Sequence, residues 1–560
     1  MKKFIPLFIA LLLFVAEIAN AQFSKYIIRF KDKTGTPFTV GNPSQYLSPR
    51  ALTRRSRQHI TIDETDFPIT PRYIDSVRLS GTVTILNVSK WLNQVCIQTT
   101  DASALARINS FPFVLASQPL MRPLTPPVRI DKLNEPVGPM MVPQTPQNIL
   151  DYYNYGVAFP QEHIHEGEFL HNNGLHGEGM MISIMDAGFR NYKTITAFDS
   201  VRNNGQIVET YDYVSNDPNV NDDDIHGMYC FSIIAANWPG QLVGSCPRAK
   251  FLLYRTEDAA TEFPIEEQNW VAAAERADSI GADVFSTSLG YTQFDNSIFN
   301  HTYADMNGHT TIIARGCAIA IRKGIISVVA AGNDGNSSWH FIGTPADTDS
   351  AVTVGAVNNA GVVAGFSSYG PSSSGVIKPT VASVGVGTAI AGSNNAPTFG
   401  NGTSFATPNL AGLVTCLWQG YQDFTNIEII DAIKRSSSIF TAPNDRIGYG
   451  IPNFHKAYDD LAQLRALRNV NLILGSDWMK IYPNPFKGSF TVLIKPQKTA
   501  NAVFTLYDAG GKLYLSKTVA LQQGQAQFLP FNTIQPLARG MYTLKFNDGI
   551  TKRSVKLLRD

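Results

Sequence analysis

NGTSFATP, residues 401–408, is the stretch that decides how this chain folds and works, because it sets a serine at the head of an apolar segment. Apolar side chains recur at helical spacing from Leu410 to Leu417, which predicts a buried helix. Ser404 has two interpretations there, a helix N-cap or a nucleophile. A lone serine at a helix start is more often an N-cap, so the surrounding sequence has to decide.

Alternating strands and helices precede that segment. Short apolar runs predict buried strands at 180–186, 251–256, 282–290 and 325–332. Helical periodicity that ends at a glycine predicts helices at 265–281 and 312–324. This alternation runs from about 151 to 462. It predicts an α/β fold with a mostly parallel sheet and helices on both of its faces.

Polar residues follow the ends of these strands, where open α/β sheets place their sites. Asp186 ends the run MMISIMD, and a carboxylate after an apolar strand is costly unless it is paired. His226 lies at a predicted helix start in DDDIHGM. Asn333 lies in the glycine-flanked turn of VVAAGNDG. With Ser404, these side chains form an ordered set of four.

The four side chains match the requirements of serine acyl transfer. Serine is a weak nucleophile at neutral pH and needs an adjacent base, which imidazole can be. A carboxylate orients the imidazole and stabilises its charged form, and an amide donor stabilises the oxyanion. We therefore predict catalysis by Asp186, His226 and Ser404, with Asn333 in the oxyanion hole.

Five ordered motifs resemble those of the subtilisin-like serine peptidases, over about 170–460. They are DAG at 186–188, HG at 226–227, STSLG at 286–290, VVAAGND at 328–334 and GTSFATPNLAG at 402–412. The segment GYGIPNFHKA at 448–457 is similar to the closing segment of the family. The chain order Asp, His, Ser is that of subtilisin. The resemblance implies a subtilisin-like domain, which we place at 149–462.

The resemblance also implies roles for further residues. The Ser404 backbone N–H would complete the oxyanion hole. Ser288, Leu289 and Gly290 would form an extended segment that pairs with the substrate backbone, as an added strand does. Gly332 would line the pocket for the side chain that precedes the cut.

Three positions depart from the family pattern. Ala187 stands where the family usually has Thr or Ser, Met228 where it usually has Thr, and Asn401 where Ser is common. None of these changes removes a catalytic group. We expect them to affect the supporting hydrogen bonds and the rate, and not the type of reaction.

The first 21 residues have the order of a secretory signal peptide. Lys2 and Lys3 precede an apolar run at 4–15, and Ala-Asn-Ala at 19–21 fits a cleavage site before Gln22. The apolar run is too short for a membrane anchor. We therefore expect a secreted or cell-surface protein. The resemblance of the C-terminal part to type IX sorting domains, described below, implies export through the periplasm of a Gram-negative bacterium.

Residues 22–148 resemble a propeptide of α+β type that assists folding and blocks the cleft. Eight prolines between Pro119 and Pro146 predict an extended linker at its end. The segment 48–60 predicts a helix with a basic face, which suits either a nucleic-acid patch or a solvated surface. The formal net charge of the chain is +1, so we favour the solvated surface and expect no nucleic-acid partner.

The C-terminal part, 476–560 after a linker at 463–475, contains short strands separated by turn residues. That pattern predicts an all-β, Ig-like sandwich. YPNP at 482–485, LYDAGGK at 506–512 and ARGMYTLKF at 538–546 resemble the sorting domains of the Bacteroidetes type IX secretion route. The resemblance implies the type IX machinery as a partner. An ordinary adhesion or spacer module is the alternative.

Metal ligands and disulfides are less well specified. His163, His165 and His171 occur without a metal-binding motif, so we predict no metal there. Three acids at 222–224 are interpreted as complements to a helix N-terminus rather than cation ligands. The chemistry requires no cofactor, and structural calcium is left unassigned. Of five cysteines, Cys230, Cys246, Cys317 and Cys416 lie beyond the N-terminal region, and their pairing stays open.

Three functional hypotheses follow. The favoured one is a secreted, monomeric serine endopeptidase that is made as a preproprotein and acts on proteins or peptides. The second is a surface binding protein on an inactive peptidase scaffold. The third is a processing protease that cuts itself or a few partner proteins.

Overall fold

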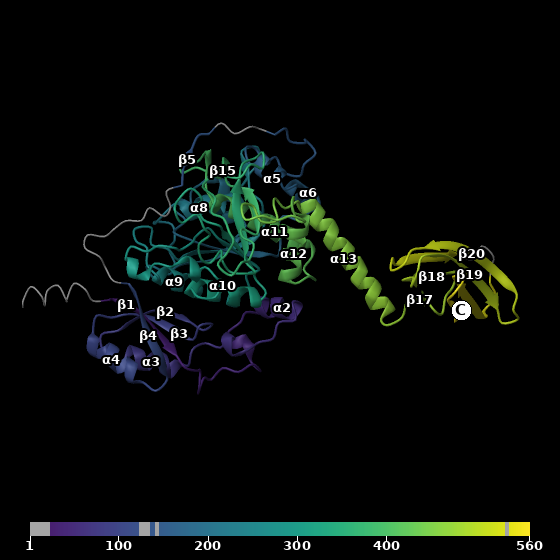
Figure 1. Cartoon of the computed structure of the whole chain (residues 1–560), viewed down its shortest axis with the longest axis horizontal. Coiled ribbons are helices and arrows are strands. Elements are labelled where there is room, and N and C mark those ends of the chain that lie inside the picture. The colour runs from purple at the N-terminus through teal and green to yellow at the C-terminus, as the bar shows by residue number, and fades with distance from the viewer. Residues whose placement is uncertain (1–22, 122–134, 141–144, 533–536) are drawn as a thin grey trace, which may run out of the picture. The chain divides into compact units, whose positions relative to one another are not determined.

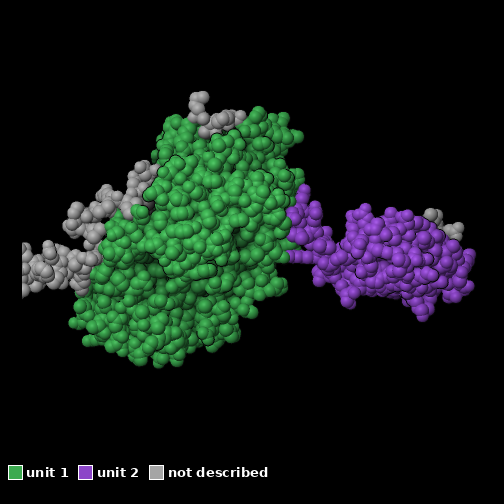
Figure 2. Space-filling view, in the orientation of Figure 1, with its two compact units in different colours: residues 1–458 green, residues 459–560 purple. Residues whose placement is uncertain are grey.

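The computed structural model describes residues 23–121, 135–140, 145–532 and 537–560. The chain divides into two compact units, residues 1–458 and 459–560, each considered by itself (Figures 1 and 2). The predicted signal peptide at 1–21 and most of the predicted Pro-rich linker lie outside the described residues.

A seven-stranded parallel sheet forms the centre of the first unit. Its strand order is β14-β13-β12-β11-β6-β10-β7, and every neighbouring pair is parallel. Except in β7, nearly all of its residues are buried, which explains the near-continuous apolar runs in the sequence. The strands are β6 (Met181–Asp186), β7 (Ile207–Asp212), β10 (Lys250–Arg255), β11 (Val284–Thr287), β12 (Ile326–Ala330), β13 (Val352–Val357) and β14 (Val381–Val384).

Two helical layers cover the sheet, as the sequence predicts. α9 and α10 pack against each other and share one apolar core with alternate strand residues such as Phe285 and Val329. α8 and α11 also pack against each other, and α11 contacts β11, β12, β13 and β14. The helices are α5 (Phe159–His163), α6 (Gly167–Asn172), α7 (Asp199–Asn203), α8 (His226–Ala235), α9 (Ile265–Ile280), α10 (Ile312–Arg322), α11 (Thr403–Gly420) and α12 (Asn426–Ser436).

A small antiparallel sheet contains one strand from the Pro-rich stretch. Its order is β15-β16-β5, formed by Thr388–Ala391, Pro397–Gly400 and Val137–Gly138. A separate hairpin joins β8 (Asn237–Trp238) to β9 (Leu242–Val243). Within the described part of the Pro-rich stretch, Val137–Gly138 is therefore held as a strand and does not form a free linker.

The N-terminal region has the predicted α+β form. Its antiparallel sheet has the order β2-β3-β1-β4 (Figure 1), and α2 and β2 contact α9 of the α/β region. The elements are β1 (Lys25–Phe30), α2 (Pro49–Arg57), α3 (Pro71–Arg78), β2 (Thr84–Ser89), β3 (Gln94–Gln98), α4 (Ala102–Ser110) and β4 (Val114–Met121).

The prediction of a solvated basic face on α2 is wrong. Arg54 and Arg55 are each only 1% exposed. Both guanidinium groups bond to the carboxylate of Asp278 on α9, and Arg55 also reaches Asp66 at 3.0 Å. Their shared partner Asp278 lies more than two hundred residues away in the sequence, so the local pattern of α2 gives no sign of it.

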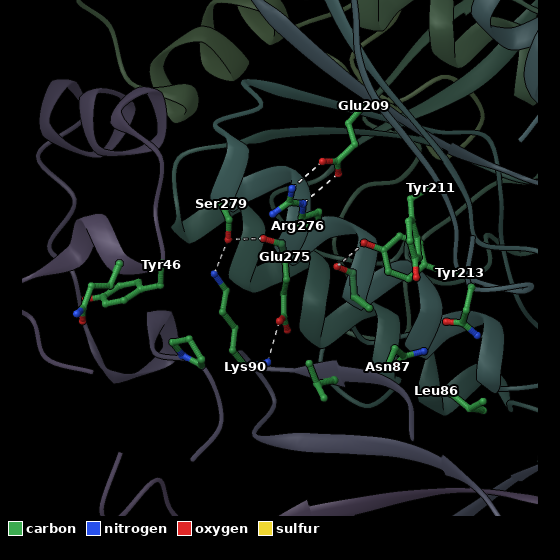
Figure 3. Close-up of a pocket in the computed structure, with 15 residues that line it drawn as sticks. Tyr46, Leu86, Asn87, Lys90, Glu209, Tyr211, Tyr213, Glu275, Arg276 and Ser279 are labelled. Atoms are coloured by element: carbon green, nitrogen blue, oxygen red, sulfur yellow. Dashed lines mark hydrogen bonds and ion pairs between the residues drawn. The ribbon is translucent and has the colours of Figure 1, made fainter. Parts of the chain in front are cut away.

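A second set of contacts between the N-terminal region and α9 surrounds a cavity of about 590 Å³ (Figure 3). Glu275 of α9 accepts hydrogen bonds from the backbone N–H groups of Lys90 (2.7 Å) and Trp91 (3.0 Å). Burial raises the pKa of Glu275 to about 7, although the charge of Lys90 opposes the shift. The Lys90 ammonium donates to Ser279 Oγ at 2.7 Å. Charged and polar groups thus join the N-terminal region to α9, together with apolar contacts such as those of Ile27 and Leu120 with Ile265.

The second unit contains the predicted β-sandwich. Its two antiparallel sheets have the orders β17-β18-β21 and β20-β19-β22-β23, around one apolar core. The strands are β17 (Met479–Tyr482), β18 (Ser489–Ile494), β19 (Ala500–Asp508), β20 (Leu513–Leu521), β21 (Gln527–Asn532), β22 (Gly540–Asn547) and β23 (Lys552–Arg559). The segment 463–475, interpreted as a linker, is almost entirely helical, within α13 (Phe454–Leu474).

Two further observations concern the chain as a whole. Within the described ranges, no helix combines the length and the apolar character needed to cross a membrane. All five cysteines are buried and carry free thiols.

Candidate active site

The predicted catalytic residues stand where strands end and helices begin. Asp186 is the last residue of β6, His226 the first of α8, and Ser404 the second of α11. Gly227 allows the close approach of β6 and α8, because a Cβ there would lie 2.8 Å from the Asp186 Cβ. The glycine of the His-Gly motif is therefore explained by the lack of space for a side chain beside Asp186.

Asp186 and His226 form a buried pair. Nδ1 of His226 lies 2.7 Å from Oδ1 of Asp186, which also accepts the backbone N–H of Ala187 at 2.8 Å. Burial alone would lower the pKa of His226, but the Asp186 carboxylate raises it well above the ordinary histidine value. A proton on Nδ1 is held by the carboxylate, so the neutral ring presents its lone pair at Nε2.

Ser404 is nearly buried and bonded to the segment after β11. Its hydroxyl donates to the Ser288 carbonyl oxygen at 3.3 Å, and Ser288 Oγ donates to the Ser404 carbonyl oxygen at 2.8 Å. The thiol of Cys230, one turn along α8 from His226, also donates to the Ser404 carbonyl oxygen at 3.4 Å. These bonds fix the start of α11 against the end of β11.

Asn333 presents its amide donors to the same site. Its Oδ1 accepts the backbone N–H and the hydroxyl of Thr403, both at 2.9 Å. With the carbonyl oxygen occupied in this way, Nδ2 faces the site and donates to Glu135 Oε1 at 2.6 Å. The four predicted groups are therefore brought together, and Thr403 orients one of them.

Comparison with known families agrees with this geometry. The model described as "Subtilase family" matches residues 177–450. The domain at 177–450 is a subtilase. A peptidase S8 propeptide domain of Bacteroidota matches residues 25–133, and a secretion system C-terminal sorting domain matches residues 480–559. The N-terminal region is thus a propeptide, and the sorting domain indicates a secreted or cell-surface protein.

Individual relatives cover the subtilase domain. The "Thermophilic serine proteinase" of Bacillus sp. (strain AK1) is 31% identical over 258 residues, 45% of this chain and 57% of that protein. "Subtilisin NAT" of Bacillus subtilis subsp. natto is 27% identical over 294 residues, 51% of this chain and 68% of the relative. This chain therefore spans little more than half the length of the first relative. A crystal structure of MycP1 from Mycobacterium smegmatis covers 60% of this chain and 94% of its own at 20% identity, with a TM-score of 0.43.

A cleft beside Ser404 brings the predicted substrate-binding residues of the subtilase domain together. The cavity has a volume of about 650 Å³, and Ser288, Leu289, Gly290, Gly332 and Asn333 line it. Gly332 has a φ of +104°, and a Cβ there would lie 2.9 Å from Ser368 Oγ. Only glycine fits this turn without strain. Glu257, Glu262 and Asp334 add carboxyl groups to the cavity wall.

Two residues at the site were not predicted from the sequence. Thr403 adjoins the nucleophile in the GTS motif, so its place in that motif was the available signal. Glu135 lies in the Pro-rich stretch, which also contains Asp131. The Oε2 atom of Glu135 lies 3.2 Å from His226 Nε2. Sequence alone gives no signal for Glu135, because its partners follow by 91 and 198 residues.

The departures from the family pattern lie in the supporting layer. Ala187 offers only its backbone N–H to Asp186, whose buried Oδ2 has no hydrogen-bond partner among the described residues. Asn401 accepts the Gly387 N–H at 2.8 Å. Met228 is fully buried. The effect of the three changes on the rate stays a prediction.

The other polar candidates have structural partners. His163 pairs with Glu168 at 2.6 Å, His165 bonds to the Pro452 carbonyl oxygen, and the His171 ring meets the hydroxyl of Tyr155. Where the chain is described, these three histidines do not belong to a common group of metal-ligand side chains.

The acids at 222–224 also have partners. Asp224 accepts the backbone N–H of His226 at 2.8 Å, which confirms that an acid complements the start of α8. Asp223 instead pairs with Arg255 at 3.2 Å. Asp222 accepts the side-chain amides of Asn219 and Asn221.

Proposed function

We propose that this protein is a secreted serine endopeptidase that hydrolyses peptide bonds through an acyl-enzyme, with Asp186, His226 and Ser404 as its triad. One observation carries the proposal. The Asp186–His226 hydrogen bond of 2.7 Å stands beside Ser404 and the Asn333 amide, at the edge of a cleft in a subtilase domain. Each group has the chemistry that serine acyl transfer requires.

Acylation uses all four groups. Neutral His226 takes the proton of the Ser404 hydroxyl at Nε2 as Oγ attacks the scissile carbonyl carbon. The Asp186 carboxylate stabilises the imidazolium that results. The Asn333 Nδ2 and the Ser404 backbone N–H donate to the carbonyl oxygen as it becomes an oxyanion. His226 then gives its proton to the leaving amine, and the acyl group stays on Ser404.

Deacylation repeats the sequence with water. His226 takes a proton from the water that attacks the acyl-enzyme, and returns it to Ser404 Oγ as the ester breaks. The same two donors stabilise the second oxyanion. No step requires a cofactor. Structural calcium stays a prediction without an assigned site.

Substrate would lie as an extended chain beside Ser288, Leu289 and Gly290, through backbone hydrogen bonds of the strand-addition type. Gly332 would line the pocket for the side chain before the cut. Thr292 and Gln293 of the same segment also line the cleft, so that an extended chain could lie along several residues of the segment. We therefore favour an endopeptidase that acts on proteins and peptides.

The segments on either side of the subtilase domain suggest how the protein is exported and matured. A signal peptide at 1–21 would direct the chain to the periplasm, and the sorting domain at 480–559 would engage the type IX machinery. The propeptide would leave during maturation. We expect the mature enzyme to be a monomer with no nucleic-acid partner.

Two alternatives stay open to test. A binding protein on an inactive scaffold has no chemical need for all four reacting groups in one geometry, so the site disfavours it. A processing protease of narrow range would use the same residues on few substrates. Hydrolysis of casein would weigh against such narrow use.

The test uses wild type, Ser404→Ala and the matched control Ser350→Ala, which changes an exposed serine of the same domain. A fluorophosphonate probe is expected to label mature wild type and S350A and to leave S404A unlabelled. Casein hydrolysis should fall by about a million-fold in S404A, since the triad acts as a unit. Equal labelling of all three chains, or no labelling of mature wild type, would reject the proposed triad.

A further inference from the structure

The wall of the cleft beside Ser404 carries charge of one sign. Glu257, Glu262 and Asp334 line the cavity, as does Glu135 from the Pro-rich stretch. Among the described residues that line it, none is Lys, Arg or His. A cleft lined by one sign of charge attracts ligands of the opposite sign. The cavity therefore suits a substrate that carries positive charge.

Asp334 lies in the part of the cleft that is expected to hold the side chain before the cut. It directly follows Asn333, whose amide faces the reacting centre, and it lines the same cavity as Gly332. A Cβ built on Gly332 would lie 3.9 Å from Asp334 Oδ2. The pocket that Gly332 lines thus has a carboxylate in its wall.

The turn that carries Asp334 is held through its backbone. The Asp334 N–H donates to Ser368 Oγ at 2.9 Å, and its carbonyl oxygen accepts the Ser337 N–H at 2.7 Å. The side chain takes no part in these bonds. Within the described ranges, neither of its carboxylate oxygens has a hydrogen bond or an ion pair. A rigid turn therefore presents a carboxylate whose partner is still to come.

The surroundings of this carboxylate are unfavourable without a cation. Asp334 is half-buried, and burial raises the pKa of its carboxyl, with no neighbouring charge to oppose the shift. The ammonium or guanidinium group of a substrate would supply the missing counter-charge through a charge-assisted hydrogen bond. A neutral side chain would leave the carboxylate unpaired, and an acidic one would be repelled.

Trp339 gives the same cavity an aromatic wall. It lines the cavity together with Ser337 and Ser338. An aromatic ring attracts a cation, and the methylene stem of a lysine or arginine packs on apolar surface while its charged end reaches a polar group. An aromatic ring and an unpaired carboxylate in one pocket thus match both parts of a long basic side chain.

We infer that the enzyme selects lysine or arginine at the residue before the cut, and that the Asp334 carboxylate is the specificity-determining group. The inference rests on the proposed function and names the substrate class of the same cleft. A hydrogen bond between charged groups typically corresponds to about 10- to 100-fold in an equilibrium constant. We expect a preference of that size in kcat/KM for a basic over a neutral side chain of equal length.

The test uses mature chains from a type IX-competent host and the peptide series acetyl-Ala-Ala-Pro-X-4-nitroanilide, in which X is lysine, norleucine or glutamate. Norleucine keeps most of the lysine stem and lacks the ammonium group. Wild type should have a kcat/KM about 10- to 100-fold higher for lysine than for norleucine, and lowest for glutamate. In Asp334→Asn, the ratio of lysine to norleucine should fall to near one.

Asp349→Asn is the matched control, because it makes the same change at an acid that is 46% exposed and does not line the cleft. It should keep the wild-type ratio. The ratio of two substrates on one enzyme is the readout, since a general loss of active protein leaves it unchanged.

A wild type that cleaves the norleucine peptide as well as the lysine peptide would overturn the inference. A lysine preference that Asp334→Asn retains would overturn the assignment to Asp334 and would place the selection at Glu257 or Glu262. If Asp334→Asn does not fold, as judged by circular dichroism, Asp334→Ser carries the same comparison. Fluorophosphonate labelling separates the two claims: a labelled enzyme without a lysine preference rejects only the inference, whereas an unlabelled wild type that cleaves no peptide rejects the proposed function itself.

Discussion

Two places in this chain bury carboxylates beside cations, and they are built in opposite ways. At the propeptide contact, Asp278 meets two guanidinium groups from α2, and these carry a permanent charge. At the active site, Asp186 meets one imidazole and one backbone N–H, and its second oxygen has no partner among the residues that the structure describes.

The difference corresponds to what each place does. The propeptide contact joins permanent charges of opposite sign, although Nε of both Arg54 and Arg55 has no hydrogen-bond partner among the described residues. A catalytic pair instead has to let the charge of His226 appear and disappear. The catalytic groups also all belong to the subtilase domain, while the contact is shared between domain and propeptide. Loss of the propeptide would therefore leave the triad complete and would uncover carboxylates on α9.

Removing the carboxylate charge at the active site is the strongest way to test this contrast. Asp186→Asn should lower kcat by about 10,000-fold. An uncharged amide does not stabilise the imidazolium, and it does not hold the neutral ring in the tautomer with its proton on Nδ1. It should also change the pH dependence. The pKa of His226 is raised, and the base has to be neutral, so wild-type kcat/KM should fall as the pH drops through that raised pKa.

In Asp186→Asn, burial still lowers the histidine pKa and the raising charge is gone, so this acid limb should move to lower pH. The measurement is kcat/KM on a peptide amide from pH 5 to 10 for mature wild type and variant. An acid limb that stays in place would show that Asp186 does not set the charge of His226.

A neutral donor at the same site should matter less. Asn333→Ala removes the Nδ2 donor and should lower kcat by about 100- to 1000-fold, with little change in KM, because the oxyanion forms only in the transition state. Thr403→Val serves as a comparison, since it removes the hydroxyl bonded to Asn333 Oδ1 and keeps the donor itself. If Asn333→Ala raised KM and left kcat unchanged, the amide would instead contribute to binding of the substrate in its ground state.

The propeptide contact should give the smallest change for a single substitution. Arg54→Met leaves Asp278 still paired with Arg55, so unfolding of the full-length S404A chain should become easier by about 2 kcal/mol in urea. Arg57→Ala is the matched control, because Arg57 is 23% exposed and its pair with Asp283 spans 3.5 Å. That control should cost no more than about 1 kcal/mol. Equal losses for the two variants would show that burial of the α2 arginines has no energetic role.

The sequence allowed the sheet, the two helical layers and the four reacting groups to be predicted, because each depends on local order. Asp186 ends an apolar run, His226 and Ser404 begin helices, and Asn333 lies in a turn between glycines. The partners of Arg54 and Glu135 are contacts across long stretches of chain, which no periodicity encodes. The neutral overall charge favoured the prediction of a solvated α2, although its arginines pair with three acids, Asp66, Asp278 and Asp283.

The place of β6 in the sheet bears on how the protein reaches this structure. β6 is the first strand of the parallel sheet in the sequence, yet it lies between β11 and β10, so its neighbours are made later. Each such pairing closes a long loop, and the chain loses conformational entropy before the stabilising contacts form. Topologies of this kind fold slowly. The propeptide is synthesised earlier and contacts α9, which in turn packs on β6. The propeptide surface that contacts α9 is therefore synthesised before α9. A peptidase domain synthesised without the propeptide would have to pack α9 on β6 without that surface.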